Sequence, residues 1–242
     1  HILLSDCNGG YGYGNNLGIR YSCDKLNADY TLIANPDVIF SNECVYKLRQ
    51  VLVDNKDCAI SAAIPLKPSG EKQKVIAWKL PTIKEEVLSA SIIFSKLFGS
   101  SSSYNEDYYK DKENCYVDVV QGAMLMLDTK LMIKYGMYDE DFFLYGEEQV
   151  LAKRINQEGY KSVLLLNEYY VHNHSVSINK SYKSLVKKKE LMFESKLLYL
   201  RKYEGLKGIS YNLTFVFYKL ALLEAWIISI IRKIQKRRIG IL

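Results

Sequence analysis

Short apolar segments alternate with helix-forming patterns along most of the chain. Tyr30–Ala34 and Cys58–Ile64 are apolar and bounded by turn residues, which predicts two buried strands. Between them, Ser41 is a suitable N-cap for a helix whose apolar residues recur at helical spacing. This order of elements predicts an α/β sheet with parallel members.

The N-terminal pattern is dominated by glycine. His1–Leu4 is apolar and predicts a short strand, which the Gly-rich segment Gly9–Gly14 follows directly. Because Asn is a favourable N-cap, a helix is predicted to begin at Asn15 or Asn16 and to end near Cys23. The glycines then form a turn between the strand and the helix.

The second half of the chain predicts three more elements. Val117–Leu127 has the apolar character of a strand, and Val163–Leu166 predicts another. Between them, Glu147–Glu158 has an apolar helical face, and Gly159 is placed to end that helix.

Charge divides the chain into two parts. From Asn179 to Leu242 there are 15 Lys/Arg and 4 Asp/Glu, a net charge of +11, whereas residues 1–178 carry a net charge of −5. A basic extension on an acidic body is typical of contact with phosphates, in nucleic acid or in anionic lipid. The acidic body offers no continuous basic face, so nucleic acid is not expected as a partner. Five cysteines without a C-x-x-C pair favour a reducing compartment.

The most apolar stretch, Tyr211–Ile231, leaves three interpretations open. It has the length of a spanning helix, but Lys219 and Glu224 near its middle would each cost ~3 kcal/mol in a bilayer. A helix that lies in the membrane interface is favoured, because basic residues follow at once. A helix that packs in a core or an oligomer is the second interpretation, and a spanning helix is the third.

Two carboxylate motifs follow predicted elements. In Asn35-Pro36-Asp37, the proline restricts the turn, and Asp37 should lie over the carboxyl edge of the sheet, where it can bind a hard divalent cation. An ordinary turn is the alternative. Glu147 and Glu148 begin a helix, where the helix dipole alone would favour them, but one of two such carboxylates can also serve as a general base.

The histidines and the glycines are less specific. His172 and His174 follow the last predicted strand; one of them can bind a metal or a phosphate, and structural roles are the alternative. The Gly-rich segment lacks the G-x-G-x-x-G spacing of a dinucleotide site, although its backbone can approach a ligand closely.

The order of these motifs resembles family 2 glycosyltransferases, in particular the rhamnosyltransferase-like branch that builds bacterial surface polysaccharides such as capsules. The resemblance extends from about Leu3 to Ser177. The motifs in chain order are Asn8-x-Gly10-Tyr11-x-x-Gly14-Asn15-Asn16, Asn35-Pro36-Asp37-Val38, Gln121-Gly122-Ala123-Met124, Tyr138-Asp139-Glu140-Asp141-Phe142-Phe143 with Glu147-Glu148, and His172 with Ser175 and Ser177.

The resemblance implies a GT-A fold, which is Rossmann-like with a mostly parallel central sheet flanked by helices, and here it carries a C-terminal helical basic tail. It implies a catalytic domain at 1–178 and a membrane-surface extension at 179–242. It also implies a nucleotide-diphosphate-sugar donor, Mn²⁺ or Mg²⁺, and inversion at the anomeric carbon. Members begin with two further strands that bind the nucleobase and ribose, and these are expected to be missing from this chain.

The resemblance also assigns roles to single residues. Asp37 and His172 match the metal site, with Asn35 in the place of a second acid. Glu148 matches the catalytic base, with Glu147 before it. The residues that match the donor-binding segments are Gly10, Gly14, Asn15, Asn35, Asp37, Gly122 and Ala123.

These features predict an enzyme that adds a sugar to a saccharide or lipid-linked saccharide at the inner face of the cell membrane, where it is peripheral and cytoplasmic. A homodimer is a further partner to consider. The alternative is a non-catalytic GT-A-like binding or scaffold subunit without a complete donor site. Convergence of Asp37, Glu148 and His172 around one cavity would distinguish the two interpretations.

Overall fold

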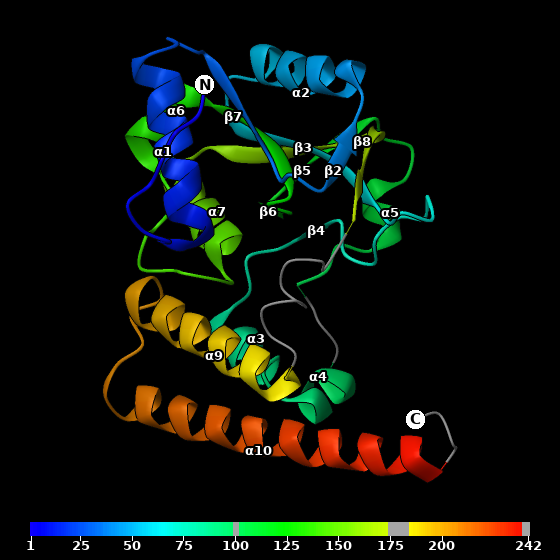
Figure 1. The fold of residues 1–242 in the computed structure, drawn as a ribbon. Helices are drawn as coiled ribbons and strands as arrows, with labels where there is room; N and C mark the ends of the chain where they lie inside the picture. The colour runs from blue at the N-terminus through cyan, green and yellow to red at the C-terminus, as the bar shows by residue number, and fades with distance from the viewer. Residues whose placement is uncertain (99–101, 174–183, 239–242) are drawn as a thin grey trace. The chain divides into compact units, whose positions relative to one another are not determined.

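The computed structural model describes residues 1–98, 102–173 and 184–238, and the side chains of 98, 185, 233 and 236–238 are not included. The chain forms two compact units (Figure 1). The first contains His1–Leu80 and Ser102–His174; the second contains Pro81–Ser101 and Ser175–Leu242. The second unit therefore includes a segment from the middle of the chain as well as the C-terminal helices.

The first unit is built on a six-stranded sheet of order β1-β7-β3-β8-β2, with β5 also paired to β8. The strands are β1 (Tyr30–Ala34), β2 (Val38–Phe40), β3 (Cys58–Leu66), β5 (Asn114–Val117), β7 (Met124–Asp128) and β8 (Lys161–His172). The mixed α/β architecture is confirmed, but the expectation of a mostly parallel sheet is wrong. Within the described residues, β3 and β8 form the parallel pair, while β7 runs antiparallel between β1 and β3, and β2 and β5 pair antiparallel with β8.

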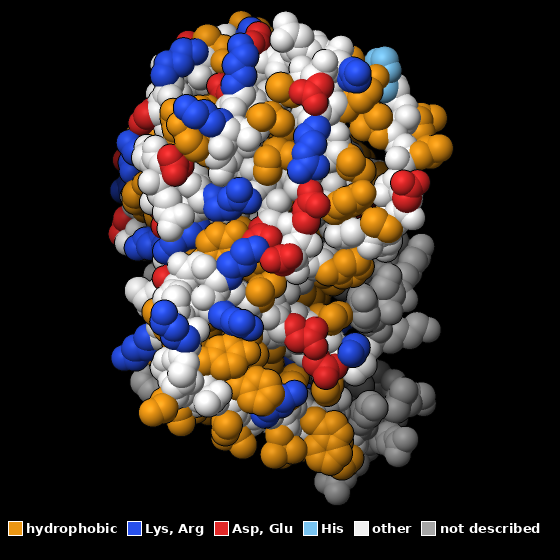
Figure 2. All heavy atoms as spheres, turned by 90° about the vertical axis from the view of Figure 1, so that its left-hand side faces the viewer, with side chains coloured by type: hydrophobic (Ala, Val, Ile, Leu, Met, Phe, Trp, Pro, Cys, Tyr) orange, Lys and Arg blue, Asp and Glu red, His pale blue; other side chains and the backbone are white. Residues whose placement is uncertain are grey.

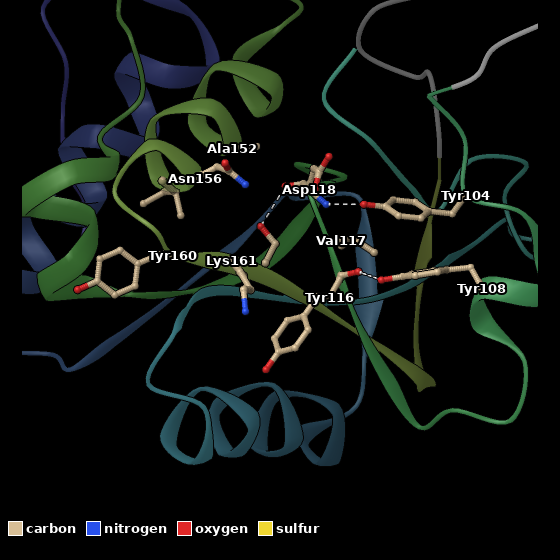
Figure 3. Close-up of a pocket in the computed structure, with 11 residues that line it drawn as sticks. Tyr104, Tyr108, Tyr116, Val117, Asp118, Ala152, Asn156, Tyr160 and Lys161 are labelled. Atoms are coloured by element: carbon tan, nitrogen blue, oxygen red, sulfur yellow. Dashed lines mark hydrogen bonds between the residues drawn. The ribbon is translucent and has the colours of Figure 1, made fainter. Parts of the chain in front are cut away.

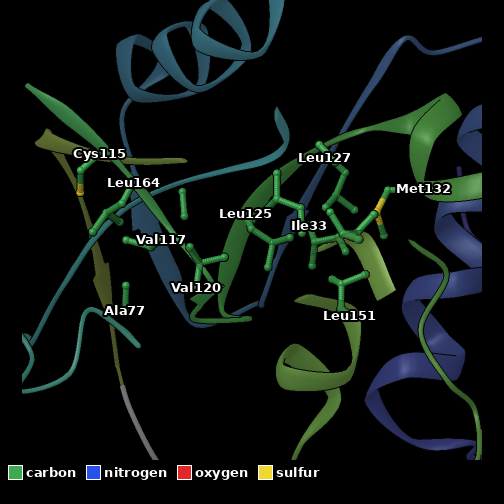
Figure 4. Close-up of a cluster of buried hydrophobic side chains, with 14 of the residues drawn as sticks. Ile33, Ala77, Cys115, Val117, Val120, Leu125, Leu127, Met132, Leu151 and Leu164 are labelled. Carbon is green, nitrogen blue, oxygen red and sulfur yellow. The ribbon is translucent and has the colours of Figure 1, made fainter. Parts of the chain in front are cut away.

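Helices cover both faces of this sheet (Figure 1). One face packs on α2 (Asn42–Asp54), and the other packs on α1 (Gly10–Asp24), α7 (Glu147–Gln157) and the short helical segments α6 (Thr129–Leu131) and η1 (Met132–Gly136). A hydrophobic core lies on each face of the sheet, and alternate residues of β7 pack into the two cores. Leu125 and Leu127 lie on the α7 side (Figure 4), and Met124 and Met126 lie on the α2 side. The smaller elements are β4 (Ala77–Trp78), β6 (Val119–Val120) and α5 (Glu106–Tyr109).

Two predicted elements agree closely with the structure. Ser41 caps α2, because its Oγ accepts a hydrogen bond of 3.0 Å from the Cys44 backbone N–H. The predicted helix at Glu147–Glu158 is α7, which begins at Glu147, and Gly159 follows it with φ +82°. Local capping and stop signals were sufficient in both places.

Two N-terminal expectations are wrong. Residues 1–9 contain no strand, and Ile2 and Leu4 are exposed rather than paired. α1 begins at Gly10, not at Asn15 or Asn16, so Gly9 is the N-cap and Gly12 and Gly14 lie inside the helix. Asn16 does not cap a helix; its buried side chain bonds instead to the segment around Tyr138, a tertiary contact that outweighs the local capping preference.

The strand expected at Val117–Leu127 is also corrected. Val117 is the last residue of β5, the rest is divided into β6 and β7, and residues 121–123 between them form no strand or helix. The strand expected at Val163–Leu166 is longer, because β8 continues to His172 and pairs there with β2. As a result, the backbone groups of residues 121–123 and the side chain of His172 lie at one edge of the sheet.

The second unit is helical. It contains α3 (Ile83–Leu88), α4 (Ile92–Phe98), α9 (Leu185–Lys202) and α10 (Gly208–Arg238). The Lys196 ammonium of α9 lies 2.7 Å from the buried Glu86 carboxylate of α3. The rings of Phe193 and Tyr218 have centroids 4.8 Å apart and join α9 to α10. The sequence pattern predicts an extension at 179–242; the second unit contains α9 and α10 from that range, together with α3 and α4 from the middle of the chain.

Candidate active site

The register of the sheet brings three distant segments to one edge. Ala34 at the end of β1 pairs with Met124 at the start of β7, and the Asn35 N–H donates to the Ala123 carbonyl at 2.8 Å. His172 at the end of β8 pairs with Val38, directly after Asp37. The turn 35–37, the segment 121–123 and the end of β8 therefore lie at the same side of the fold.

Asp37 and His172 face one another at this edge. Asp37 Oδ1 lies 3.5 Å from His172 Nε2, and the Asn173 N–H donates to the Asp37 carbonyl at 3.1 Å. The Asp37 side chain is 27% exposed and that of His172 is 9% exposed. The imidazole is thus largely fixed by its surroundings, while the carboxylate remains open to a ligand.

This pair fits one side of a divalent-cation site. A carboxylate oxygen and an imidazole nitrogen 3.5 Å apart can occupy neighbouring positions around one ion. Within the described parts of the chain there is no group of three or more His, Cys, Asp or Glu residues that could hold a metal. Mg²⁺-type ions commonly use one or two protein ligands and take the rest from substrate phosphates and water, so the pair is compatible with a cation bound together with a diphosphate.

Glu147 and Glu148 form a second group at the start of α7. The helix is preceded by Gly146 with φ +91° and has no side-chain N-cap. The two carboxylates are the acidic groups of its first turn, where the positive end of the helix dipole favours negative charge. Burial, together with the neighbouring Glu148 charge, raises the pKa of Glu147 to about 8. Burial also raises the pKa of Glu148, against the lowering effect of the backbone N–H groups of Glu148 and Gly122. Two interacting carboxyls of this kind retain a proton near neutral pH.

Gly122 links Glu148 to α1. The Gly122 N–H donates to Glu148 Oε1 at 3.3 Å, and the Tyr11 hydroxyl donates to the Gly122 carbonyl. A Cβ at position 122 would lie 2.7 Å from Glu148 Oε1 and 3.0 Å from the Tyr11 hydroxyl. Only glycine allows both groups to approach this closely.

Three of the remaining predicted donor-site residues, Gly10, Gly14 and Asn15, lie in α1, and Ala123 lies between β6 and β7. Gly10 has φ +86°, and a Cβ there would lie 2.4 Å from the Phe143 carbonyl, so Gly10 is required by packing against the segment that leads to α7. A Cβ at Gly14 would have nothing within 4 Å, and Asn15 is partly buried. Ala123 is buried in the core on the α2 side of the sheet. His174, Ser175 and Ser177 lie outside the described residues.

Sequence analysis missed a tyrosine cluster around Glu148. The rings of Tyr11 and Tyr138 meet edge to face with centroids 5.6 Å apart. Burial and the Glu148 charge together raise the pKa of Tyr11, so its hydroxyl remains a hydrogen-bond donor. Burial likewise raises the pKa of Tyr170, with smaller effects from Tyr11 and Glu148. The chain has 20 tyrosines, and no spacing among them marks these three.

Two of the cavities in the described part of the first unit lie apart from the predicted site residues. One of about 250 Å³ lies against the C-terminal half of α7 and is lined by Tyr104, Tyr116 and Asn156 among others (Figure 3). Its wall is fixed by hydrogen bonds from the Tyr108 hydroxyl to the Tyr116 carbonyl (2.6 Å) and from the Asp118 N–H to the Tyr104 hydroxyl (3.0 Å). The second is an open cleft of about 850 Å³ beside β8.

Comparison with known proteins gives two curated relatives. No family model matches the chain. The chain is similar to the low-salt glycan biosynthesis hexosyltransferase Agl10 of Haloferax volcanii, with 27% identity over 158 residues that cover 65% of this chain and 47% of the relative. It is also similar to rhamnosyltransferase WbbL of Escherichia coli K12, with 22% identity over 154 residues that cover 62% of this chain and 55% of the relative. The chain spans about half the length of the curated relatives that it matches.

Among solved structures, the chain is similar to a crystal structure of GalNAc-T7 with UDP, GalNAc and Mn²⁺. The identity is 12%, the TM-score is 0.47, and the match covers 69% of this chain and 31% of the other. The similarity of this chain to proteins named as glycosyltransferases therefore rests on the two sequence relatives.

Proposed function

We propose that this chain is the catalytic part of a metal-dependent, inverting glycosyltransferase of the GT-A fold. Its donor is a nucleoside-diphosphate sugar, and its acceptor is a saccharide or a lipid-linked saccharide of a surface polysaccharide. The observation that carries the proposal is the convergence of the Asp37–His172 pair and the Gly122–Glu148 contact at one edge of the sheet. The similarity to a named hexosyltransferase and a named rhamnosyltransferase supports it.

In this proposal Glu148 is the general base. Its carboxylate takes the proton of the acceptor hydroxyl as that oxygen attacks the anomeric carbon of the donor. The bond between the anomeric carbon and the diphosphate oxygen breaks, and the nucleoside diphosphate leaves with the electron pair. Because the attack is direct, the configuration at the anomeric carbon inverts and no covalent enzyme intermediate forms. Burial raises the pKa of Glu148, which makes its carboxylate a stronger base than an exposed glutamate.

Asp37 and His172 would hold Mn²⁺ or Mg²⁺ in the same proposal. The bound cation supplies positive charge that stabilises the departing diphosphate. The Asp37 carboxylate is exposed enough to reach the ion, and the buried His172 ring is held in register by the pairing of β8 with β2. Gly10, Gly14, Asn15, Asn35, Gly122 and Ala123 would contribute the surroundings of the donor.

The test is release of nucleoside diphosphate by the full-length protein. A panel of UDP-, dTDP- and GDP-sugars is assayed with Mn²⁺ and with EDTA, for the wild type, Glu148→Gln and the control Glu158→Gln. Glu158 is exposed at the C-terminal end of α7. Glu158→Gln therefore removes one negative charge, as Glu148→Gln does, but at a position away from the proposed site. One donor should be turned over, and EDTA or Glu148→Gln should lower the rate at least 100-fold. Donor binding without turnover by any variant would instead support the non-catalytic binding subunit.

We also propose that α10 docks this protein on an anionic membrane surface at its cytoplasmic face. α10 is the helix in the described part of the chain that is long and apolar enough to cross a membrane, by length and composition. Its inward side carries Thr214, Tyr218, Ala221 and Ala225, whereas eleven large apolar side chains on α10 are exposed. Figure 2 shows hydrophobic side chains gathered on the surface of this helix. Lys219 on the helix and the basic residues after Ile231 favour an anionic interface.

Vesicle binding tests this docking. The wild type should co-sediment with vesicles that contain phosphatidylglycerol more strongly than with phosphatidylcholine vesicles, and salt should weaken the binding. The triple variant Leu220→Ser, Leu223→Ser, Ile227→Ser should bind at least tenfold more weakly, since these side chains are 58%, 51% and 45% exposed and would be buried in the interface. A control with Leu26→Ser and Tyr46→Ser, two exposed side chains of the first unit, should bind as the wild type does. A dimer in solution that loses dimerisation in the triple variant, without vesicle binding, would assign the face to a second copy instead.

A further inference from the structure

The open cleft of about 850 Å³ in the first unit is basic and lined with tyrosines. Four lysines (Lys72, Lys74, Lys110 and Lys112) line it against two carboxylates, those of Glu106 and Asp107. Its floor is apolar, with Ile64 and Leu166 from the neighbouring strands β3 and β8. A cleft of this size can hold a mono- or disaccharide.

Aromatic rings give the cleft flat surfaces suited to sugar rings. Tyr104, Tyr109 and Tyr169 all line it. The Lys72 ammonium lies 6.0 Å from the centre of the Tyr169 ring, so a positive charge and an aromatic face are presented together. Tyr169 is 40% exposed and is therefore available for contact.

One polar group in the wall is left without a partner. The Gln73 backbone N–H donates to the Pro65 carbonyl at 2.9 Å, which fixes the position of this residue. Its side-chain Nε2 is buried and has no hydrogen-bond partner among the described residues. Because a buried amide donor without an acceptor is unfavourable, this group is suited to a ligand oxygen.

The cleft is connected to the carboxylate of Glu148 through two consecutive residues. The Gln121 side-chain amide donates to the carbonyl of Val75, which lines the cleft. The next residue, Gly122, donates its N–H to Glu148 Oε1. A ligand in the cleft thus lies beside the segment that positions the proposed base.

From these observations we infer that the cleft binds the acceptor, and that this acceptor is a saccharide carrying an anionic group, a phosphate or a carboxylate. That the bound saccharide is the acceptor rests on the proposed function, whereas the binding of an anionic sugar to the cleft does not depend on it. The lysines attract the anionic group, the tyrosines contact the sugar ring, and Gln73 donates to a ring or hydroxyl oxygen. The acceptor hydroxyl of the same sugar would lie on the Val75 side of the cleft, which is the side next to the segment Gln121–Gly122.

Binding is measured by saturation-transfer NMR in EDTA with no donor present, so that the result does not depend on turnover. The probes are α-D-glucose 1-phosphate, D-glucuronate and the neutral methyl α-D-glucopyranoside. The variant Lys72→Ala, Lys74→Ala is compared with Lys25→Ala, Lys56→Ala, which removes the same charge from exposed positions outside the cleft. Both anionic sugars should bind the wild type and the control alike, and the cleft variant should bind them roughly five- to tenfold more weakly.

Three results would overturn the inference. Equal weakening in both double variants would mean that only the overall charge matters. Equal binding of the neutral and the anionic sugars would remove the role of the lysines. Inorganic phosphate that competes as well as glucose 1-phosphate would remove the role of the sugar. A difference between glucose 1-phosphate and glucuronate assigns the anionic group as phosphate or carboxylate. If the wild type binds the anionic sugars but releases no nucleoside diphosphate from any donor, the proposed function is refuted and the anionic-sugar site is retained.

Discussion

The substitution Gly122→Ala tests whether the backbone at this position sets the place of the proposed base. The added Cβ would lie 2.7 Å from Glu148 Oε1, and ordinary contact begins at 3.4 Å, so the carboxylate must move by about 0.7 Å. Oε1 is the free end of a flexible side chain and can yield, and the backbone at 122 does not have the positive φ that would strain an alanine. The cost to stability should therefore be small, about 1 kcal/mol.

The effect on catalysis should be larger than the effect on stability. A displacement of about 1 Å at a catalytic group can lower a rate ~100-fold, so a shift of this size should lower kcat roughly tenfold to 100-fold. The assay is release of nucleoside diphosphate at saturating donor, together with thermal unfolding of the same preparations.

Gly18→Ala is the matched control. Gly18 lies within α1, and a Cβ there meets nothing within 4 Å. Its substitution should leave the rate unchanged and raise stability by up to ~1 kcal/mol, because alanine favours the helix. If Gly122→Ala folds normally and keeps the wild-type kcat, contact with Gly122 does not position Glu148 for catalysis, and the reasoning is refuted.

Two further predictions concern stability. The folded-state pKa of Glu147 is raised to about 8 from 4.5, so the folded protein holds a proton that the unfolded chain has lost, and stability should fall as pH rises from about 4.5 to 8. Glu147→Gln should remove this pH dependence, which is measured as the unfolding temperature between pH 5 and 8. If the unfolding temperatures of variant and wild type change in parallel with pH, the reasoning is wrong. Asn16→Ala removes two hydrogen bonds to the Tyr138 backbone and one to Glu140, which should cost about 2–3 kcal/mol in urea unfolding, whereas the exposed Asn42→Ala should cost little.

Local signals in the sequence were sufficient for elements that end at caps. Ser41 fixes the start of α2, and Gly159 the end of α7, because each satisfies or terminates backbone groups within a few residues. The capping box formed by Thr82 and Glu85 at the start of α3 was an equally readable signal that sequence analysis did not use.

Strand pairing could not be predicted in the same way. β7 lies between β1 and β3, and its partners are separated from it by about 60 to 100 residues of sequence, so apolar character alone does not specify its direction. The start of α1 was misplaced for a related reason. Its glycines disfavour a helix locally, but Gly12 lies so close to Tyr138 that a Cβ would come within 2.9 Å, and this packing requires glycine inside the helix.

The order of motifs predicted which residues share the sheet edge, but not how they are held. Asp37 lies beside His172, and Gly122 lies beside Glu148, as one site would require. Their roles in binding and catalysis stay predictions. The tyrosines Tyr11, Tyr138 and Tyr170 could not be selected from the sequence, because their surroundings are made by segments more than 100 residues apart.

The irregular segment Gln121–Ala123 explains why these parts depend on one another. A regular strand would direct its N–H and carbonyl groups to neighbouring strands. Here the Gly122 N–H bonds to Glu148 of α7, the Gly122 carbonyl accepts from Tyr11 of α1, and the Ala123 carbonyl accepts from Asn35 after β1. The Gln121 side chain bonds to the wall of the cleft. Three consecutive residues therefore contact the proposed base, the turn that carries Asp37 and the proposed acceptor cleft, so the break between β6 and β7 is what allows one short segment to position all three.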